Sequence, residues 1–250
     1  MENEKKRCTA VVLAAGSGSR MKSNVAKQYM LLAGKPLIWY ALQAVEQSEI
    51  IDDCILVAGA EELTYVKTEI VQKYGFQKVQ AVIAGGTERY LSVGKAMKAM
   101  EEGCLTVPNE NGYVFIHDGA RPFLTEEILR STYEGVKKYG ACVAAVPSKD
   151  TVKIADEQGF VKETPERRLV WSIQTPQVFD TGLIVNAYKK LLEAEEEARQ
   201  SGSKTVQVTD DASVAELFTD KKVKLVEGSY ENIKITTPED LKTAEVFLKK

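Results

Sequence analysis

An alternation of short apolar runs with amphipathic helical patterns constrains the fold of this chain more than any other feature. The apolar runs predict buried strands, and the segments between them repeat apolar residues at helical spacing. Such an alternation is typical of a Rossmann-like α/β fold, in which a mostly parallel sheet carries helices on both faces. Strands are expected at 9–14, 54–58, 78–83, 113–117 and 141–146, and helices at 36–47, 61–74, 89–101 and 125–139.

The pattern changes after residue 147. Residues 151–164 alternate around Asp-Glu-Gln-Gly, which predicts a β-hairpin too polar for the core. Such a hairpin is either a solvated loop or an arm that grips a partner, and the residues alone leave both open. No linker divides the chain, so we expect a single domain over 1–250 with a projecting β-hairpin arm at about 148–168. Further strands are expected at 169–173 and 223–227, and helices at 181–199, 210–218 and 238–249.

Charge and composition argue against several classes of protein. The net charge of −3 argues against a nucleic-acid binder, and no apolar run approaches the roughly 20 residues that a membrane span needs. The charged N-terminus lacks the apolar core of a secretory signal, which favours a cytoplasmic protein. The four cysteines are widely spaced and are expected as buried, reduced thiols. The single histidine, His117, rules out a site that needs two.

Polar residues follow three of the predicted strands. Parallel strands end at the same edge of a sheet, and such sheets bind ligands at that edge. We therefore expect these three segments to lie together. They are AAGSGSR after the first strand, AGGTER after the third and HDGARP after the fourth.

The segment after the first strand is a glycine-rich loop whose spacing differs from that of well-known phosphate-binding loops. The dinucleotide fingerprint G-x-G-x-x-G fits at Gly16 and Gly18 but has Met21 at its third position. The P-loop pattern fails because proline follows the Gly-Lys pair at 34–35. The catalytic Asp and Asn partners of a kinase glycine loop are absent. The loop is therefore a different phosphate site or a plain turn.

Small residues and cations in this loop suit a triphosphate. Alanine and glycine let backbone N–H groups approach a ligand closely. Arg20 and Lys27 add two cations, and residues 9–45 contain no acid that would neutralise them. A tight turn with two solvated cations explains the spacing equally well, because glycine loops are common turn devices. The cradle would consist of Ala14, Ala15, Gly16 and Gly18.

Asp118 follows the apolar strand at 113–117 and is a candidate ligand for Mg²⁺. Magnesium takes one or two carboxylates together with phosphate oxygens, so an aspartate at this edge of the sheet suits it. The alternative role is to cap the next helix. Thr125 fills that role better, because two glutamates follow it in the first helical turn.

Several longer motifs occur in a fixed order along the chain. They are AAGSGSRM…KQY, GGTERYLSV, HDGARP, PSKDTVK, ERRLVWSIQTPQ, TDDAS and EGSYENIKITTPEDL. Each motif alone is weakly specific, but all of them in register are highly specific. From Ala10 to about Leu248 the chain resembles one family of enzymes, the 2-C-methyl-D-erythritol 4-phosphate cytidylyltransferases of the non-mevalonate isoprenoid pathway.

The resemblance implies a reaction with CTP and Mg²⁺. The phosphate of methylerythritol phosphate attacks the α-phosphorus of CTP in line, and pyrophosphate leaves. The chain offers no obvious nucleophile–base pair, which agrees with catalysis by positioning and charge neutralisation. Arg20 and Lys27 match the pair that stabilises the transition state. Residues implied to bind the nucleotide are Ala14, Ala15, Gly16, Gly18, Gly86, Thr87 (aspartate in many relatives), Ser92 and, with the metal, Asp118.

For the acceptor, the resemblance implies residues from two subunits. In the family the arm interlocks a homodimer; Arg167 crosses to hold the substrate phosphate in the neighbouring site, and Lys234 assists from the same subunit. The adjacent Arg168 leaves the register open by one residue, although Thr164 and Trp171 favour Arg167. Residues implied at the substrate are Arg121, Thr151, Arg167, Thr175, Thr209 and Lys234, of which Arg167 and Lys234 are also catalytic.

Two alternative functions remain open. Ribitol-5-phosphate cytidylyltransferases resemble this family in fold and loop, but they usually have AGG in the first loop and lack LVWSIQTPQ; this chain has Ala14-Ala15-Gly16. The second alternative is a catalytically silent nucleotide-binding protein of the same fold. The presence of every implied charged residue argues against it. These residues are Arg20, Lys27, Asp118, Arg167 and Lys234.

Overall fold

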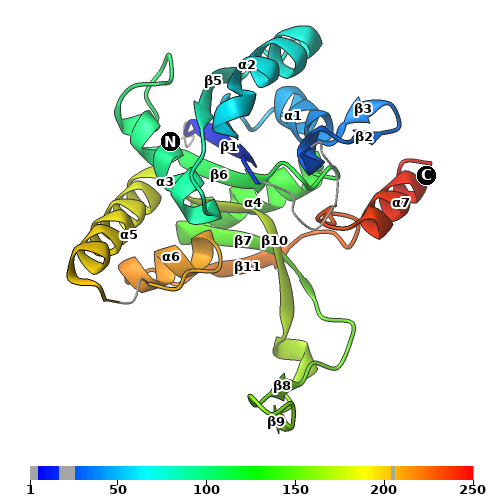
Figure 1. Ribbon diagram of the computed structural model, residues 1–250, viewed down its shortest axis with the longest axis vertical. Coiled ribbons are helices and arrows are strands. Elements are labelled where there is room, and N and C mark those ends of the chain that lie inside the picture. The colour runs from blue at the N-terminus through cyan, green and yellow to red at the C-terminus, as the bar shows by residue number, and fades with distance from the viewer. Residues whose placement is uncertain (1–4, 17–25, 204–205, 250) are drawn as a thin grey trace.

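The computed structural model describes residues 5–16, 26–203 and 206–249. Its centre is a seven-stranded sheet with the order β11-β7-β10-β6-β1-β4-β5 (Figure 1). β10 runs antiparallel to β6 and β7, and the remaining pairs are parallel. The predicted mostly parallel α/β sheet is confirmed. The strands are β1 (Cys8–Ala14), β4 (Asp53–Ala58), β5 (Val79–Ala84), β6 (Tyr113–Asp118), β7 (Ala141–Pro147), β10 (Trp171–Asp180) and β11 (Lys224–Glu227).

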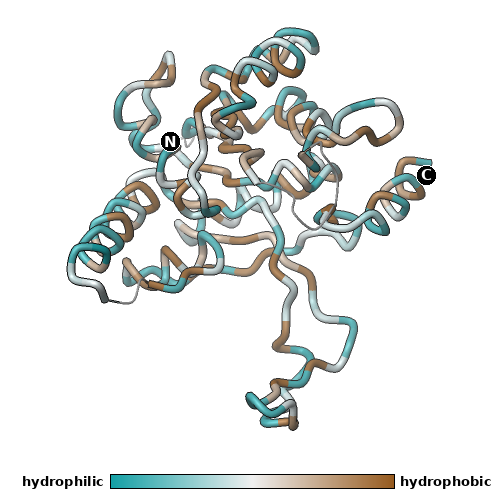
Figure 2. Tube along the Cα trace, in the orientation of Figure 1, coloured by the Kyte–Doolittle hydropathy of each residue, from teal (hydrophilic) through white to brown (hydrophobic). Residues whose placement is uncertain are grey.

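Helices cover both faces of this sheet, as predicted (Figure 1). Neighbouring residues of β1 show why its apolar run is continuous: Val11 packs in one buried cluster and Val12 in another. Successive side chains of a strand point to opposite faces of the sheet. When helices cover both faces, apolar residues are therefore needed at successive positions. Figure 2 shows these hydrophobic stretches along the central strands. The Val12 side carries α1 (Leu37–Gln47), α2 (Leu63–Tyr65) and α4 (Glu126–Tyr139); the Val11 side carries α3 (Arg89–Glu101), α5 (Thr181–Ser201) and α6 (Asp211–Phe218).

Local signals explain where the helices begin and end. The hydroxyl of Thr125 accepts a backbone N–H in the first turn of α4, as predicted, and Gly140 ends this helix with a φ of 76°. Gly75 closes the helix expected at 61–74 with a φ of 70°. That helix is not regular: it consists of η3 (Ala60–Glu62), α2 and the π-helical η4 (Val66–Gln72).

The strand expected at 169–173 is wrong in its bounds. A 3-10 turn, η5 (Arg167–Leu169), comes first, and β10 then continues well past residue 173. The extension contains Gln174, Thr175 and Gln177, which are buried and whose side chains are hydrogen-bonded. Polar residues are tolerated inside a protein when such bonds are made, so β10 extends beyond its expected end.

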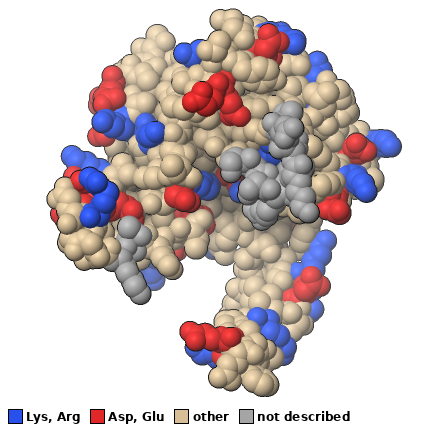
Figure 3. Space-filling view, in the orientation of Figure 1, with Lys and Arg blue, Asp and Glu red and all other residues tan. Residues whose placement is uncertain are grey.

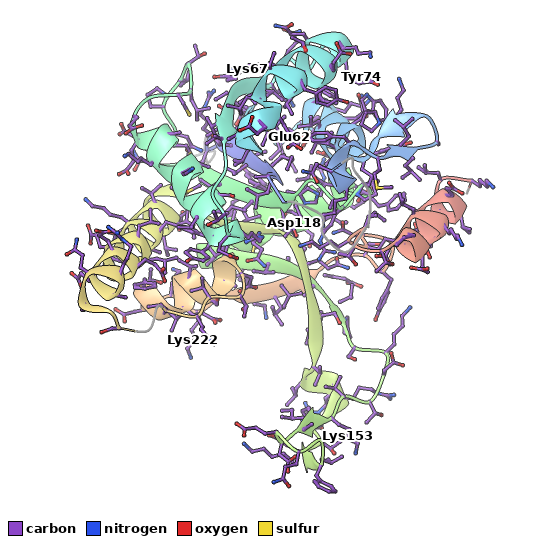
Figure 4. The ribbon with its side chains drawn as sticks, in the orientation of Figure 1. Glu62, Lys67, Tyr74, Asp118, Lys153 and Lys222 are labelled. Carbon is purple, nitrogen blue, oxygen red and sulfur yellow. The ribbon has the colours of Figure 1, made fainter. Side chains whose placement is uncertain are left out.

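A short β-hairpin projects from the body on the segment between β7 and β10 (Figure 1). It pairs β8 (Ile154–Ala155) with β9 (Val161–Glu163), and its side chains are exposed. The carboxylate of Asp156 accepts backbone N–H groups at 158 and 160, which stabilises the predicted turn. Figure 4 shows Lys153 on this arm, far from Asp118 in the body.

The C-terminal helix α7 (Pro238–Phe247) packs beside a small hairpin that the sequence did not reveal, β2 (Leu31–Leu32) and β3 (Lys35–Pro36). None of the helices in the described part of the chain is long and apolar enough to cross a membrane. The four cysteines are free; three are buried as expected, whereas Cys104 is half-buried.

Candidate active site

A cavity of about 320 Å³ opens at the carboxyl edge of β1, β5 and β6. The residues that follow these three strands meet there, as the topology predicts. Figure 4 shows Asp118 in the middle of the body, where β6 ends. Nine of the sequence-predicted site residues line the cavity: Ala14, Ala15, Gly16, Lys27, Gly86, Thr87, Ser92, Asp118 and Lys234. Gly18 and Arg20 lie outside the described residues.

Gln28 fixes the chain on one side of the glycine loop to the end of β1. Its side chain is buried, and its Nε2 donates to the carbonyl oxygens of Ala14 and, at 3.1 Å, of Gly16. The neighbouring Lys27 therefore starts from a fixed point beside the cavity. Sequence reasoning missed Gln28, although it stands in the quoted KQY motif.

Gly86 lines the cavity on the side of α3, and its neighbour Gly85 packs closely against Ala15. A Cβ on Gly86 would lie 2.4 Å from the Cβ of Leu91, and one on Gly85 would lie 2.4 Å from the Cβ of Ala15. Both positions therefore require glycine. The backbone N–H of Gly86 donates to the hydroxyl of Ser92 at 3.0 Å, which holds the turn before α3.

Asp118 lies between two cations. Its Oδ1 accepts from Nε of Arg89 at 3.0 Å, and its Oδ2 accepts from Nζ of Lys234 at 2.7 Å. Burial alone would raise the pKa of Asp118, but the charges of Arg89 and Lys234, with a smaller contribution from Arg121, outweigh burial and hold the pKa well below its usual range. The carboxylate is therefore ionised at neutral pH.

Arg89 lines the cavity and is anchored by a buried residue behind it. Its guanidinium makes a two-pronged bond to Asp211, with Nη1 2.9 Å from Oδ1 and Nη2 2.7 Å from Oδ2. The hydroxyl of Tyr188 donates to the same carboxylate at 2.6 Å, and both Asp211 and Tyr188 are fully buried. Sequence reasoning missed Arg89 and Asp211. Opposite charges inside the GGTERYLSV and TDDAS motifs were the available signal.

A second chain of hydrogen bonds lies behind the backbone of Asp118. The backbone N–H of Asp118 donates to the hydroxyl of Thr175 at 3.1 Å, this hydroxyl lies 3.0 Å from Nδ1 of His117, and Nε2 of His117 lies 3.2 Å from the carbonyl of Arg121. Burial lowers the pKa of His117 to about 4. A neutral imidazole protonated at Nε2 satisfies each of these contacts. Thr175 thus supports Asp118 from behind and does not line the cavity.

Arg121 also lies outside the cavity lining. Its Nη1 donates to the carbonyl of Asn232 at 2.7 Å, and the side chain of buried Asn232 donates to the carbonyl of Thr175 at 2.8 Å. These bonds join the loop that carries Lys234 to β10. Farther along, the hydroxyl of Tyr230 donates to the carbonyl of Pro147, where the arm begins, at 2.8 Å.

The remaining predicted residues lie away from the cavity lining. Thr151 and Arg167 are exposed on the arm segment and its 3-10 turn. Thr209 is exposed just before α6, and its backbone N–H donates to the hydroxyl of Ser213 at 3.1 Å. Arg168, the alternative to Arg167, pairs with Glu166 in the same turn.

The donor set fits a cation that a substrate also binds. Among the described residues, no group of three or more His, Cys, Asp or Glu could hold a metal. Asp118 nevertheless presents an ionised carboxylate to the cavity, and Mg²⁺ is commonly bound by one or two carboxylates together with phosphate oxygens.

This combination of fold and cavity defines a class, the α/β proteins that bind phosphorylated ligands at the carboxyl edge of a parallel sheet. Residues 8–250 match the family of 2-C-methyl-D-erythritol 4-phosphate cytidylyltransferase. The chain therefore belongs to this family of nucleotidyltransferase enzymes.

Individual relatives agree over nearly the full length. The chain is 46% identical to the 2-C-methyl-D-erythritol 4-phosphate cytidylyltransferase of Lachnospira eligens, covering 96% of this chain and 99% of the relative. It is 44% identical to the protein of the same name from Lachnoclostridium phytofermentans, covering 97% of each. The crystal structure of 4-diphosphocytidyl-2C-methyl-D-erythritol synthase from Anaerococcus prevotii superposes with a TM-score of 0.80 at 36% identity, covering 99% of this chain and 100% of that one.

Proposed function

We propose that the protein transfers the cytidylyl group of CTP to 2-C-methyl-D-erythritol 4-phosphate, which gives CDP-methylerythritol and pyrophosphate. The observation that carries this proposal is the convergence of Lys27, Lys234 and Arg89 on one cavity around Asp118. Both substrates are anions that repel each other, and fixed cations in a partly closed site offset that repulsion. The names of the relatives supply the cytosine and the acceptor.

The chemistry is an in-line displacement. A phosphate oxygen of the acceptor attacks the α-phosphorus of CTP, the bond to the β-phosphate breaks, and pyrophosphate leaves with the electron pair. We assign Lys27, together with Arg20, to the charge that develops on the α-phosphate. Removing one such contact typically costs about 2.7–4 kcal/mol of transition-state stabilisation. The backbone at Ala14, Ala15, Gly16 and Gly18 is assigned to the CTP phosphates and ribose.

The part of the cavity beside α3 is assigned to the cytosine base of CTP. Gly86, Thr87 and Ser92 line the cavity on the side of α3. The side chain of Ser92 is engaged with the backbone of Gly86, so backbone groups of this turn remain to contact cytosine. Such contacts tolerate Thr87 in place of the aspartate common in relatives.

Asp118 would hold a Mg²⁺ ion at this site. When bound, the ion neutralises phosphate oxygens of CTP. Asp118 is suited to that role because neighbouring cations keep it ionised. The backbone bond from Asp118 to Thr175 adds to its positioning.

The acceptor site is proposed to be shared between two copies of the chain. The arm at about 148–168 and the turn that follows it expose apolar side chains that a partner would cover: Phe160 is 69% exposed, Val161 62% and Leu169 65%. We propose that the arm joins a homodimer and that Arg167 and Thr151 reach the partner's acceptor phosphate. Among the described residues Arg167 forms no ion pair, whereas Arg168 is paired with Glu166, which favours Arg167 as the anchor.

The other assignments complete the proposal. Lys234 meets the acceptor phosphate from the same subunit, Thr209 borders the substrate, and Arg121 and Thr175 act from just outside the cavity. The chain works as one domain over 1–250 in the cytoplasm. Figure 3 shows Lys and Arg interspersed with Asp and Glu over the visible face, in the part drawn in colour. This mixture supports small-molecule substrates rather than nucleic acid.

The test is release of pyrophosphate from CTP by the purified protein. Release with methylerythritol phosphate and Mg²⁺, but not with ribitol 5-phosphate, supports the proposal. Release with ribitol 5-phosphate alone replaces it by the sister activity. Release with neither acceptor indicates a silent nucleotide-binding protein. Activity in excess chelator would contradict the metal requirement.

The shared site has its own test. Lys27→Ala and Arg167→Ala homodimers should each lose most of their activity. If the two residues act from different subunits, each mixed dimer rebuilds one intact site of its two. A 1:1 mixture with random subunit pairing then recovers about a quarter of wild-type activity. No recovery on mixing, with exchange of subunits verified, would contradict the shared site.

A further inference from the structure

Both carboxylate oxygens of Asp118 are occupied by cations of the protein itself. Arg89 binds Oδ1 and Lys234 binds Oδ2. A divalent cation that coordinates Asp118 needs one of these oxygens and repels both cations at such short range. Withdrawal of one of the two side chains relieves this repulsion when the metal binds.

The two cations are held very differently. Arg89 has a second, two-pronged bond to the buried carboxylate of Asp211, which Tyr188 also holds. If Arg89 withdrew, it would leave Asp211 as an unpaired buried charge, which is strongly unfavourable. Within the described residues, the ammonium of Lys234 has Asp118 as its single ion-pair partner. Lys234 is thus the cation that can leave.

The backbone around Lys234 is fixed, so the change is confined to its side chain. The carbonyl of Asn232 accepts from Arg121 at 2.7 Å, and the N–H of Ile235 donates to the carbonyl of Ala120 at 2.8 Å. A flexible four-carbon side chain that starts between these anchors can reorient without a backbone movement.

We propose that Lys234 is a placeholder for the divalent cation: it holds Oδ2 of Asp118 while the metal is absent, and it turns to substrate phosphate when the metal takes that oxygen. The inference rests on the proposed metal at Asp118. Lys234 then binds two anions in succession, first the carboxylate of Asp118 and then the substrate phosphate. Its charge becomes available to the acceptor phosphate only in a site that already contains the metal.

Binding of Mn²⁺ to the full-length protein without nucleotide tests the exchange, with electron paramagnetic resonance reporting free Mn²⁺. Lys234→Met removes the competitor for Oδ2 and should lower the Kd for Mn²⁺ by about tenfold or more, the effect of a lost charge-assisted hydrogen bond. Lys95→Met is the matched control. Its ammonium lies beside the cavity on the carbonyl of Gly85, not on Asp118, so it should change the Kd less than about threefold.

Adding Asp118→Asn to Lys234→Met should abolish the tighter binding. If Lys234→Met binds Mn²⁺ no more tightly than Lys95→Met does, the placeholder role is wrong. Turnover of CTP with methylerythritol phosphate is assayed separately. If the wild-type protein turns over its substrates but Lys234→Met has no increased affinity for Mn²⁺, the exchange is refuted and the proposed function is unaffected.

A crystal soaked in Mn²⁺ alone gives a direct view. We expect an anomalous peak at Oδ2 of Asp118, Nζ of Lys234 beyond hydrogen-bonding distance, and Arg89 still bound to Asp211. A metal on Asp118 with Lys234 still in contact, or with Arg89 displaced instead, would overturn the inference. So would a metal that binds the protein without contacting Asp118.

Discussion

Two buried aspartates on the strands beside β1 have opposite pKa shifts. Asp53, at the start of β4, is fully buried and is bound by one guanidinium, with Nε of Arg7 2.7 Å from its Oδ2. Burial dominates there and raises its pKa, although the Thr9 hydroxyl and the charge of Arg7 oppose the shift. Asp118, at the end of β6, is also buried, but its pKa is lowered because Arg89 and Lys234 together outweigh burial.

A main difference is the number of cations around each carboxylate. One arginine is enough to keep Asp53 within the fold. The aspartate at the cavity has more positive charge around it than its own burial requires, which suits the proposed binding of anionic substrates. A cluster of this kind points to a functional site, since a buried ion pair contributes little net stability compared with apolar residues, although removing one partner alone is costly.

The largest effect is expected on stability, from Arg89→Met. This substitution removes the cation that is bound to both Asp118 and Asp211. Asp211 is left buried without its cation, so unfolding free energy should fall by about 3–5 kcal/mol. Urea denaturation followed by circular dichroism measures it. Arg130→Met is the control, because its pair with Glu126 is exposed and loose at 3.6 Å. Equal losses for both variants would show that the Arg89 network does not stabilise the fold.

The next largest effect separates the two aspartates by activity. Asp118→Asn should lower kcat for cytidylyl transfer by about 10²–10³-fold, because a preorganised charge is lost from the site. Asp53→Asn makes the same substitution at the opposite edge of the sheet, away from the cavity, and should leave kcat close to wild type. Steady-state pyrophosphate release measures both. A comparable loss of kcat in the two folded variants would remove the functional distinction between the aspartates.

The pH dependence of stability should differ in sign between the two sites. The pKa of Asp118 is lower in the folded protein than in the unfolded chain, where it is about 3.9. Its contribution is therefore present above pH 4 and lost as pH falls toward the folded pKa. The pKa of Asp53 is raised, so its ionisation opposes folding as pH rises above about 4.

Chemical denaturation of the wild type and both Asn variants between pH 3 and 7 separates these contributions. The stability advantage of wild type over Asp118→Asn should shrink as pH falls, and that over Asp53→Asn should grow. Each unit of difference between the folded and unfolded pKa corresponds to about 1.4 kcal/mol of unfolding free energy. Parallel curves for the two variants would contradict the opposite shifts.

The smallest effect is expected from Tyr188→Phe. The substitution removes one hydrogen bond to Asp211 but leaves the two-pronged bond from Arg89 in place, so stability should fall by about 1 kcal/mol. Thermal denaturation measures the loss, and kcat should change little. A loss as large as that of Arg89→Met would mean that Tyr188, rather than Arg89, secures the buried carboxylate.

The sequence predicted the strand–helix alternation and the meeting of three strand ends, because apolar periodicity is local and parallel topology then determines the edge. It could not predict the Arg89–Asp211 bond, whose partners lie 122 residues apart and meet only through the packing of α3, α5 and α6. Nor could it show that Thr175 and Arg121 point into hydrogen-bonded structure beside the cavity. Their direction depends on β10 continuing as a buried strand, which its polar residues concealed.

The loop that carries Lys234 is joined to its surroundings at several points: through Asn232 to β10, and through Tyr230 to Pro147 at the root of the arm. It is therefore mechanically continuous with the part of the chain that we propose to contact the partner subunit. A few hydrogen bonds therefore separate the root of the arm from the backbone beside Lys234. We expect substitutions at the root of the arm to affect the proposed site even though they lie outside its cavity.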